Sequence, residues 1–395
     1  MSSPDNGTRV IELPAKYLLT ESGVQYFVRR RIPLRELRTR RGTRSSGIVW
    51  RRYEPENVKR FVAYELLDEI EIERTEFLTR RNDIMSLTAQ TVIGILEKRF
   101  RPELKEMIRR SSVFAPIKER IAGTSPEQMQ NYLKRNERAI RILRKSLFLE
   151  PLIAIQNEAE MGTEERSERI ELIRRIIAAI DAETWFLISV IPDTNGRDML
   201  MRAIQELILT YTTRFRIADY VSLMLMELLE YAERTQIINF AERDQYIRTH
   251  PDELASRLAD PEFREKLFRR AAASNSLLSL DYRFSGNPYN PIRRPEMQIT
   301  VVNKGLVGYE SRREILTKRT RNVRHVPLAD FYRTETPSQL DTSLGVYYLS
   351  YVEQACADVG VRFAADMERD ERLEETRTRM TLAVWSYPAK TGEER

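Results

Sequence analysis

The segment Leu278–Phe284, with the sequence LSLDYRF, decides the fold class because apolar and polar side chains alternate along it. A period of two predicts a β-strand with one buried face and one polar face. The same period recurs over 297–301, 361–367 and 380–384. Four strands of this kind predict an antiparallel or mixed sheet near the end of the chain.

Helical patterns surround these strands. A predicted helix over 218–234 precedes the first strand, and another over 346–359 lies between the second and the third. Farther upstream, Ser125–Gln128 (SPEQ) combines an N-cap, a proline at the first helical position and a capping-box glutamine. The chain is therefore predicted to be α+β: a basic N-terminal element and a helical bundle come first, and an α/β sandwich with helices on one face of the sheet follows.

Three short motifs follow one another in the order helix, strand and loop. They are Met226–Ala232 (MELLEYA), Ile299–Gly305 (ITVVNKG) and Thr342–Leu349 (TSLGVYYL). In this order they resemble the GHKL ATPase domain of sensor histidine kinases and anti-sigma-factor kinases. The resemblance implies a GHKL-like sandwich over 217–388, with a helical insertion at 235–275.

The resemblance places six nucleotide-pocket positions on this chain: Glu227, Tyr231, Asn303, Gly305, Ser343 and Gly345. Glu227 matches the general base of some family members. Tyr231 stands where the family has an asparagine that binds magnesium, an ion that requires closely spaced oxygen ligands. Ser343 replaces a phosphate-loop glycine, whose missing Cβ lets the backbone approach phosphate. These departures predict a pseudokinase-like domain without catalytic residues and without a cofactor.

Four regions are predicted along the chain. Residues 1–60 form an arginine-rich element, in which the alternation at 24–28 and the segment Ile48–Trp50 indicate short strands. Residues 61–163 are helical, and 164–216 form a helical pair. The GHKL-like region completes the chain.

The helical pair carries an apolar seam. Its members recur at steps of three and four residues, with Thr184 at the one missing step: Ile170, Ile173, Ile177, Ile180 and Leu187. Such a seam fits either the internal core of a bundle or a dimer interface. We therefore expect residues 164–216 to form a homodimer, with an internal core as the alternative.

A dense run of arginines is the strongest charge feature. Only Glu36 offsets it within its span, and its ten members are Arg29, Arg30, Arg31, Arg35, Arg38, Arg40, Arg41, Arg44, Arg51 and Arg52. Guanidinium groups suit phosphates and carboxylates. Tyr26, Phe27, Trp50 and Tyr53 lie nearby and are able to stack on bases. The run predicts an anion- or partner-binding segment, although no nucleic-acid-binding motif accompanies it.

The composition excludes several classes of protein and kinds of site. Cys356 is the single cysteine, and the chain has only two histidines. These counts predict no disulfide framework, no metal site and no histidine phosphoacceptor. No apolar stretch approaches the roughly 20 residues that a membrane span requires. We expect a cytoplasmic protein without a membrane span.

Together these features predict a non-catalytic signalling or regulatory protein that binds a protein partner. One alternative is a divergent ATP-binding kinase or ATPase of the GHKL class, which would use ATP and magnesium. Another is a nucleic-acid-binding regulator that uses the arginine run.

Overall fold

The protein is described from a computed structural model. The structure describes residues 10–40, 42–111, 113–114, 117–158, 162–191, 194–242, 253–274, 276–285, 296–304, 352–370, 372 and 375–384. The chain divides into two compact units, one formed by 1–95 with 217–395 and the other by 96–216. The second unit is thus inserted into the sequence of the first.

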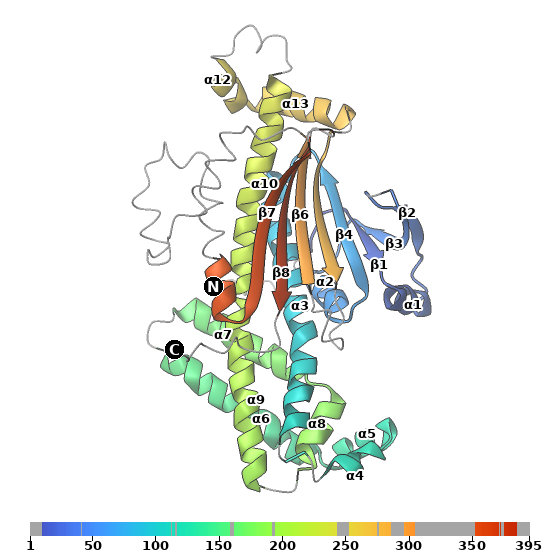
Figure 1. Cartoon of the computed structure of the whole chain (residues 1–395), viewed down its shortest axis with the longest axis vertical. Coiled ribbons are helices and arrows are strands. Elements are labelled where there is room, and N and C mark those ends of the chain that lie inside the picture. Colours follow the sequence, from blue (N-terminus) through green and yellow to red (C-terminus); the bar gives the residue numbers. More distant parts are fainter. Residues whose placement is uncertain are drawn as a thin grey trace, which may run out of the picture. The chain divides into compact units, whose positions relative to one another are not determined.

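The first unit is built on one eight-stranded antiparallel sheet (Figure 1). Its spatial order is β2-β3-β1-β4-β5-β6-β8-β7. The strands are β1 (Ala15–Leu19), β2 (Arg35–Arg38), β3 (Arg44–Trp50), β4 (Leu67–Arg74), β5 (Leu278–Ser285), β6 (Glu296–Lys304), β7 (Val361–Asp370) and β8 (Glu375–Val384). This sheet and its helices confirm the predicted α+β class.

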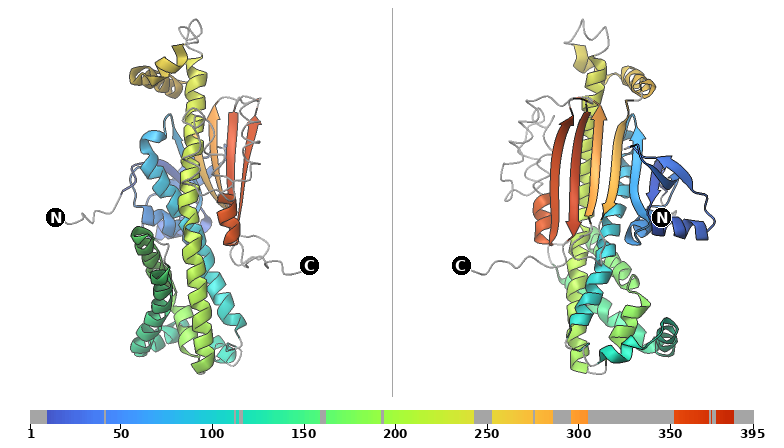
Figure 2. Two further views of the ribbon diagram at one scale, coloured as in Figure 1. Left: turned by 90° about the vertical axis from the view of Figure 1, so that its left-hand side faces the viewer. Right: turned by 45° about the vertical axis from the view of Figure 1, so that its right-hand side comes forward.

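Alternation along the strands gives the sheet one apolar face. Ile70, Tyr282 and Ile299 lie side by side through the pairing of β4, β5 and β6, and all are fully buried. Helix α10 (Ile217–Ala241) packs against β6, and Thr88 of α3 (Arg81–Arg110) shares a 2.7 Å hydrogen bond with the Tyr282 hydroxyl. Both helices lie on the same side of the sheet (Figure 2). The opposite face has no helix among the described elements.

Two short helices pack at the N-terminal edge of the sheet. Helix α1 (Glu21–Arg29) begins where the Thr20 hydroxyl accepts the Gly23 amide, and α2 (Pro55–Ala63) follows β3. Rings from both helices and the strands join one aromatic cluster: Tyr17, Tyr26, Phe27, Trp50, Tyr53 and Phe61. The strand predicted at 24–28 is therefore wrong, because N-capping and burial of Phe27 favour a helix there.

Strand β4 joins the two ends of the sequence in one sheet. It pairs with β1 on one side and with β5 on the other, so β1–β4 and β5–β8 are continuous. The prediction that residues 61–163 are helical is wrong at Leu67–Arg74, which form β4. The grouping of the chain thus differs from the four predicted regions, because residues 1–60 share a sheet with 278–384.

Two further helices of the first unit lie near the end of α10 (Figure 1). They are α12 (Leu254–Ala259) and α13 (Pro261–Ala273), and a short helix at 352–358 precedes β7. Helix α13 packs on α10, and the two bury Ile237, Ala241 and Leu267 in a small apolar cluster. The predicted helical segment at 235–275 is therefore largely helical where it is described.

The second unit is helical. It contains the second half of α3 and then α4 (Lys118–Ala122), α5 (Pro126–Arg135), α6 (Glu137–Asn157), α7 (Thr163–Ala178), α8 (Ala182–Ser189) and α9 (Thr194–Phe215). The capping box predicted at Ser125 and Gln128 is present at the start of α5.

The predicted seam lies within the core of this second unit. Ile173 is fully buried, and Ile177, Ile180 and Leu187 are at most 8% exposed. Helix α7 packs against α6 and α9 of the same chain. These four side chains therefore serve the internal core, whereas Ile170 is half-buried.

Candidate functional site

The arginine run does not form one continuous strip. Arg29 ends α1, while Arg30 and Arg31 form the turn that follows it. Arg31 adopts a left-handed conformation with a φ of 58°, which turns the chain toward β2. Arg35 and Arg38 are the first and last residues of β2. These five side chains are exposed, and two of them belong to β2, the outermost strand of the sheet.

Several of the arginines have partners within the chain. The Arg30 guanidinium lies 4.0 Å from the centre of the Tyr26 ring. Arg44 forms an ion pair of 3.4 Å with Glu36, and Arg52 one of 3.0 Å with Glu12. Arg41 lies outside the described residues. Exposed pairs of this kind stabilise a fold only slightly.

Five arginines have no ion pair in the part of the chain that the structure describes. They are Arg29, Arg31, Arg35, Arg38 and Arg51, and all are exposed. Arg38 lies directly opposite Arg44 in the pairing of β2 with β3, so two cations are neighbours there. Like charges in this position repel each other, and an external anion would relieve the repulsion.

Strand β2 is also an edge strand. It pairs with β3 on one side, and no described strand pairs with its other side. Three of its four residues are exposed. The outer backbone of such a strand presents unpaired N–H and C=O groups that an extended peptide is able to join. Backbone groups and free guanidinium groups therefore occur together at this edge.

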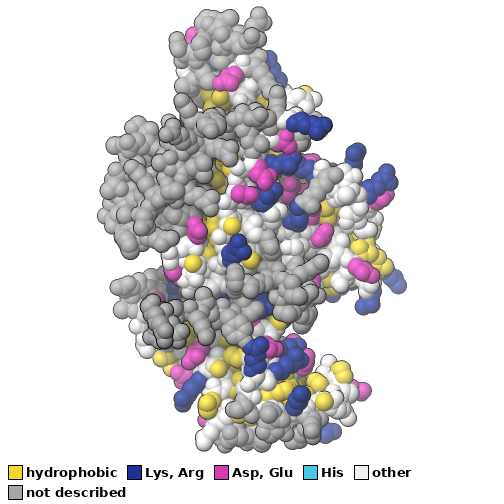
Figure 3. Space-filling model, viewed as in Figure 1, with side chains coloured by type: hydrophobic (Ala, Val, Ile, Leu, Met, Phe, Trp, Pro, Cys, Tyr) yellow, Lys and Arg dark blue, Asp and Glu magenta, His cyan; other side chains and the backbone are white. Residues whose placement is uncertain are grey.

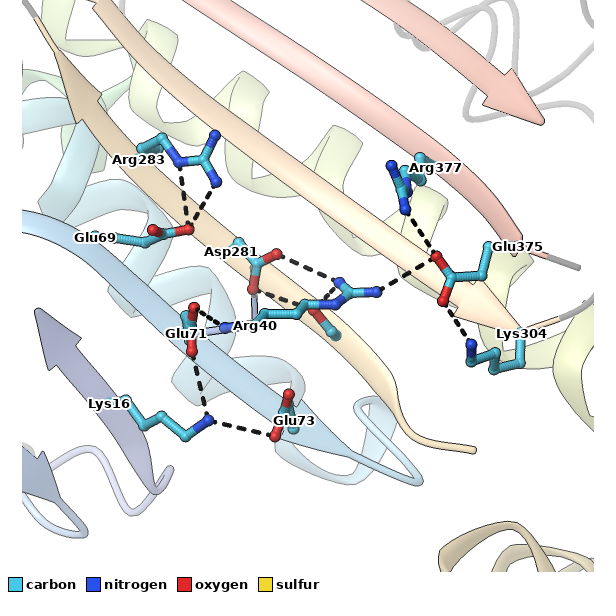
Figure 4. A network of polar contacts seen from close by, with 11 residues as sticks. Lys16, Arg40, Glu69, Glu71, Glu73, Asp281, Arg283, Lys304, Glu375 and Arg377 are labelled. Atoms are coloured by element: carbon cyan, nitrogen blue, oxygen red, sulfur yellow. Dashed lines mark hydrogen bonds and ion pairs between the residues drawn. The ribbon is translucent and has the colours of Figure 1, made fainter. Parts of the chain in front are cut away.

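Arg40 has a different environment from its neighbours. It lies in the β2–β3 hairpin and reaches across the helix-free face of the sheet (Figure 4). Its amide donates to Glu71 at 2.8 Å, and its Nη1 lies 3.4 Å from Asp281 Oδ2 and also donates to Ser279. Its Nη2 lies 4.0 Å from Glu375 Oε2. We call these contacts the Arg40 network.

Further ion pairs surround the Arg40 network. Glu71 also pairs with Lys16 at 3.4 Å, and Glu375 with Lys304 at 2.5 Å and Arg377 at 3.1 Å. Charged side chains of both signs are mixed over the strands in the space-filling view (Figure 3). The positive charge of Arg40 is thus neutralised within the chain. The prediction that Arg40 binds an external anion or partner is therefore corrected, because its guanidinium already contacts Asp281 and Glu375.

The carboxyl group of Asp281 titrates unusually within this network. Burial raises its pKa from 3.8 to about 6, the positive charge of Arg40 opposes the rise, and Glu71 adds to it. Between these two pH values only the folded protein holds the proton. Protonation therefore stabilises the fold at low pH, and this contribution is lost as the pH rises through about 6.

We expect Asp281→Asn to raise the free energy of unfolding at pH 8 by about 1–3 kcal/mol, because one pKa unit corresponds to about 1.4 kcal/mol. The variant should also lose the wild-type decline in stability between pH 4 and 6. Urea unfolding over a pH series measures both effects. Asp366→Asn, on an exposed carboxylate of the same face, is the control and should change neither. A less stable Asp281→Asn at pH 8 would contradict the prediction.

The predicted nucleotide-pocket positions are only partly described. Gly305, Ser343 and Gly345 lie outside the described residues. Asn303, near the end of β6, is 3% exposed, and its Nδ2 has no hydrogen-bond partner among the described residues. Glu227 and Tyr231 are half-buried on α10. Burial raises the pKa of Glu227, and the neighbouring Glu230 raises it further.

The aromatic rings near the arginine run are partly buried. Phe27 and Tyr53 are buried in the aromatic cluster, so their rings are not free to stack on bases. In the described part of the chain, no three acidic, histidine or cysteine side chains come together as a metal site. Among the described helices, none combines the length and the apolar character of a membrane span.

Sequence reasoning identified the exposed arginines but missed the Arg40 network. One signal was present, because Ser279, Asp281 and Arg283 alternate with the apolar residues of β5. That pattern shows a polar strand face. It does not show that Arg40, 241 positions away from Asp281, would cover it.

Comparison with known proteins gives relatives without an assigned activity. The profile of DUF8084, a family of unknown function, matches residues 6–384. An uncharacterized protein of Treponema pallidum (strain Nichols) is 23% identical over 377 residues, which cover 93% of this chain and 96% of that protein. No solved structure matches the chain. A functional assignment therefore rests on the residues themselves.

Proposed function

The chain belongs to the DUF8084 family of unknown function, and we propose that it is a non-catalytic regulatory protein that binds an acidic segment of a protein partner. The docking site is the edge formed by β2 and the end of α1. The observation that supports this proposal is a group of four exposed arginines that have no ion pair within the described residues and belong to the end of α1, the turn that follows it and edge strand β2: Arg29, Arg31, Arg35 and Arg38.

The chemistry of the edge favours an extended acidic peptide. Main-chain hydrogen bonds to β2 would hold the peptide, and carboxylates would face Arg35 and Arg38. Charge-assisted hydrogen bonds between guanidinium and carboxylate are among the stronger polar contacts. Nucleic acid is the less favoured ligand, because two of the aromatic rings proposed to stack on bases are buried.

The absence of catalysis is proposed from residue identity. Tyr231 stands where the resembling ATPases bind magnesium through an asparagine, and its phenol is a poor ligand for this ion. The half-buried Glu227 then has no metal-bound phosphate beside it to act on. The proposed role is therefore recognition.

We expect the full-length protein to bind a labelled peptide of alternating glutamate and valine, and Arg35→Glu with Arg38→Glu to weaken this binding. The loss should be about tenfold to a hundredfold, since about 1.4 kcal/mol corresponds to each factor of ten. Fluorescence anisotropy at several salt concentrations measures the affinity.

The matched control is Arg202→Glu with Lys266→Glu, which makes the same change in net charge at two exposed positions elsewhere. It should leave peptide binding intact. Equal losses in both double variants would show that only net charge matters and would refute the docking site. Tighter binding to a single-stranded DNA oligonucleotide, with a steep salt dependence, would favour nucleic acid instead.

A further inference from the structure

Helix α6 has an apolar stripe on its outer face. Its inner face buries Ile140, Leu147, Pro151 and Ile155 against the rest of the second unit. On the opposite side, the exposed fractions are 62% for Ile142, 43% for Leu149 and 40% for Ile153. Large aliphatic side chains that line up in this way on a surface commonly mark an interaction site.

The spacing of the stripe is that of a coiled-coil seam. Ala139, Ile142, Ser146, Leu149 and Ile153 are separated by steps of three and four residues, and all five are exposed. A heptad of this form predicts pairing with another helix. The buried seam of α7 has the same spacing, so exposure is what distinguishes the two. Of these two seams, that of α6 is exposed at all five positions, whereas that of α7 is mostly buried.

Two residues of opposite charge lie beside the stripe. Lys145 and Glu150 lie on opposite sides of the seam, both are exposed, and neither has an ion pair within the described residues. Their separation of five positions is the one that joins a g position to the following e position of a parallel partner helix. A second copy of α6 would therefore form two equivalent Lys–Glu pairs.

We propose that the protein self-associates through α6, with α6 of a second copy parallel and in register. Leu149 then packs on Leu149 of the second copy, and Lys145 faces its Glu150. The stripe from Ala139 to Ile153 provides a contact about 20 Å long, which places the interface among the small ones. This interface does not involve the β2 edge, so each proposal is tested separately.

Sedimentation of the full-length protein over a range of concentrations tests self-association. We expect a reversible dimer in the wild type, and a dissociation constant raised about a hundredfold or more in Ile142→Glu with Leu149→Glu. Circular dichroism should show an unchanged fold, because both residues are exposed in a single chain. Met199→Glu changes another exposed aliphatic side chain, which is 70% exposed on α9, and should dimerise like the wild type.

Charge exchange and crosslinking test the direction of the helices. Lys145→Glu and Glu150→Lys should each weaken the dimer, and the two changes together should restore it. Ala139→Cys should form a disulfide between the two copies, because parallel helices place the two Ala139 positions opposite each other.

A wild type that stays monomeric at all concentrations, or stripe variants that dimerise as tightly as the wild type, would refute the proposal. Failure of both charge rescue and crosslinking would refute the parallel register.

Discussion

Replacing Ile173 with aspartate should lower the free energy of unfolding by about 4 kcal/mol or more, the largest effect that we expect from a single substitution. Ile173 is fully buried on α7, where it faces the other helices of the second unit. The change removes a buried aliphatic side chain and places a carboxylate in an apolar core, where it has no partner.

Urea unfolding followed by circular dichroism measures this effect. Met199→Asp is the matched control, since the same acidic side chain enters an exposed position and should cost less than about 0.5 kcal/mol. A folded Ile173→Asp protein that has lost only its dimer would contradict the internal core. It would support a homodimer formed through residues 164–216 instead.

A second large loss is expected from Arg40→Met. The Arg40 guanidinium lies beside the carboxylates of Asp281 and Glu375, whose side chains are 11% and 8% exposed. Glu71 accepts from the backbone amide of Arg40, which this substitution retains. Removal of one partner of a buried ion pair typically costs about 3–5 kcal/mol, and Arg40 is itself 24% exposed, so we expect about 2–3 kcal/mol at pH 8.

The loss should be smaller at pH 5, because Asp281 is then largely protonated in the folded protein and carries no uncompensated charge. Arg44→Met is the control on the same hairpin. Its partner Glu36 is exposed, so this change should cost no more than about 0.5 kcal/mol. Equal effects of both substitutions at both pH values would show that the Arg40 network does not stabilise the fold.

Local patterns predicted the strands with clear alternation. The strands β5 to β8 match the segments named from their period of two, and α10 matches the helix predicted over 218–234. These elements can be predicted from the local sequence because a half-buried strand and a buried helix each impose their own period on neighbouring residues. The prediction needed no knowledge of distant partners.

Strand β4 shows why other elements were missed. Its sequence LDEIEIER contains glutamates, which are common on the outer face of a helix, and it pairs with a strand far along the chain. Glu69 and Glu71 are buried because cations from other elements meet them. Such partners are supplied by the tertiary structure, so the local sequence does not contain them.

The candidate site also has residues that the sequence predicts and residues that it does not. Exposed arginines at the end of α1 and on β2 could be predicted from charge alone, whereas the pairing of Arg40 required the folded sheet. The two apolar seams could not be distinguished by spacing, because α6 and α7 follow the same heptad. Which of them is covered depends on how the helices pack.

The long separation between β4 and β5 has a consequence for the growing chain on the ribosome. About 200 residues must be synthesised after β4 before β5 is available, which takes roughly 10–40 s at ordinary rates of translation. During this time β4 is an open edge, and its glutamates discourage pairing with other nascent chains. We therefore expect the acidic residues that later bind Arg40, Lys16 and Arg283 also to hinder aggregation of the unfinished sheet during synthesis.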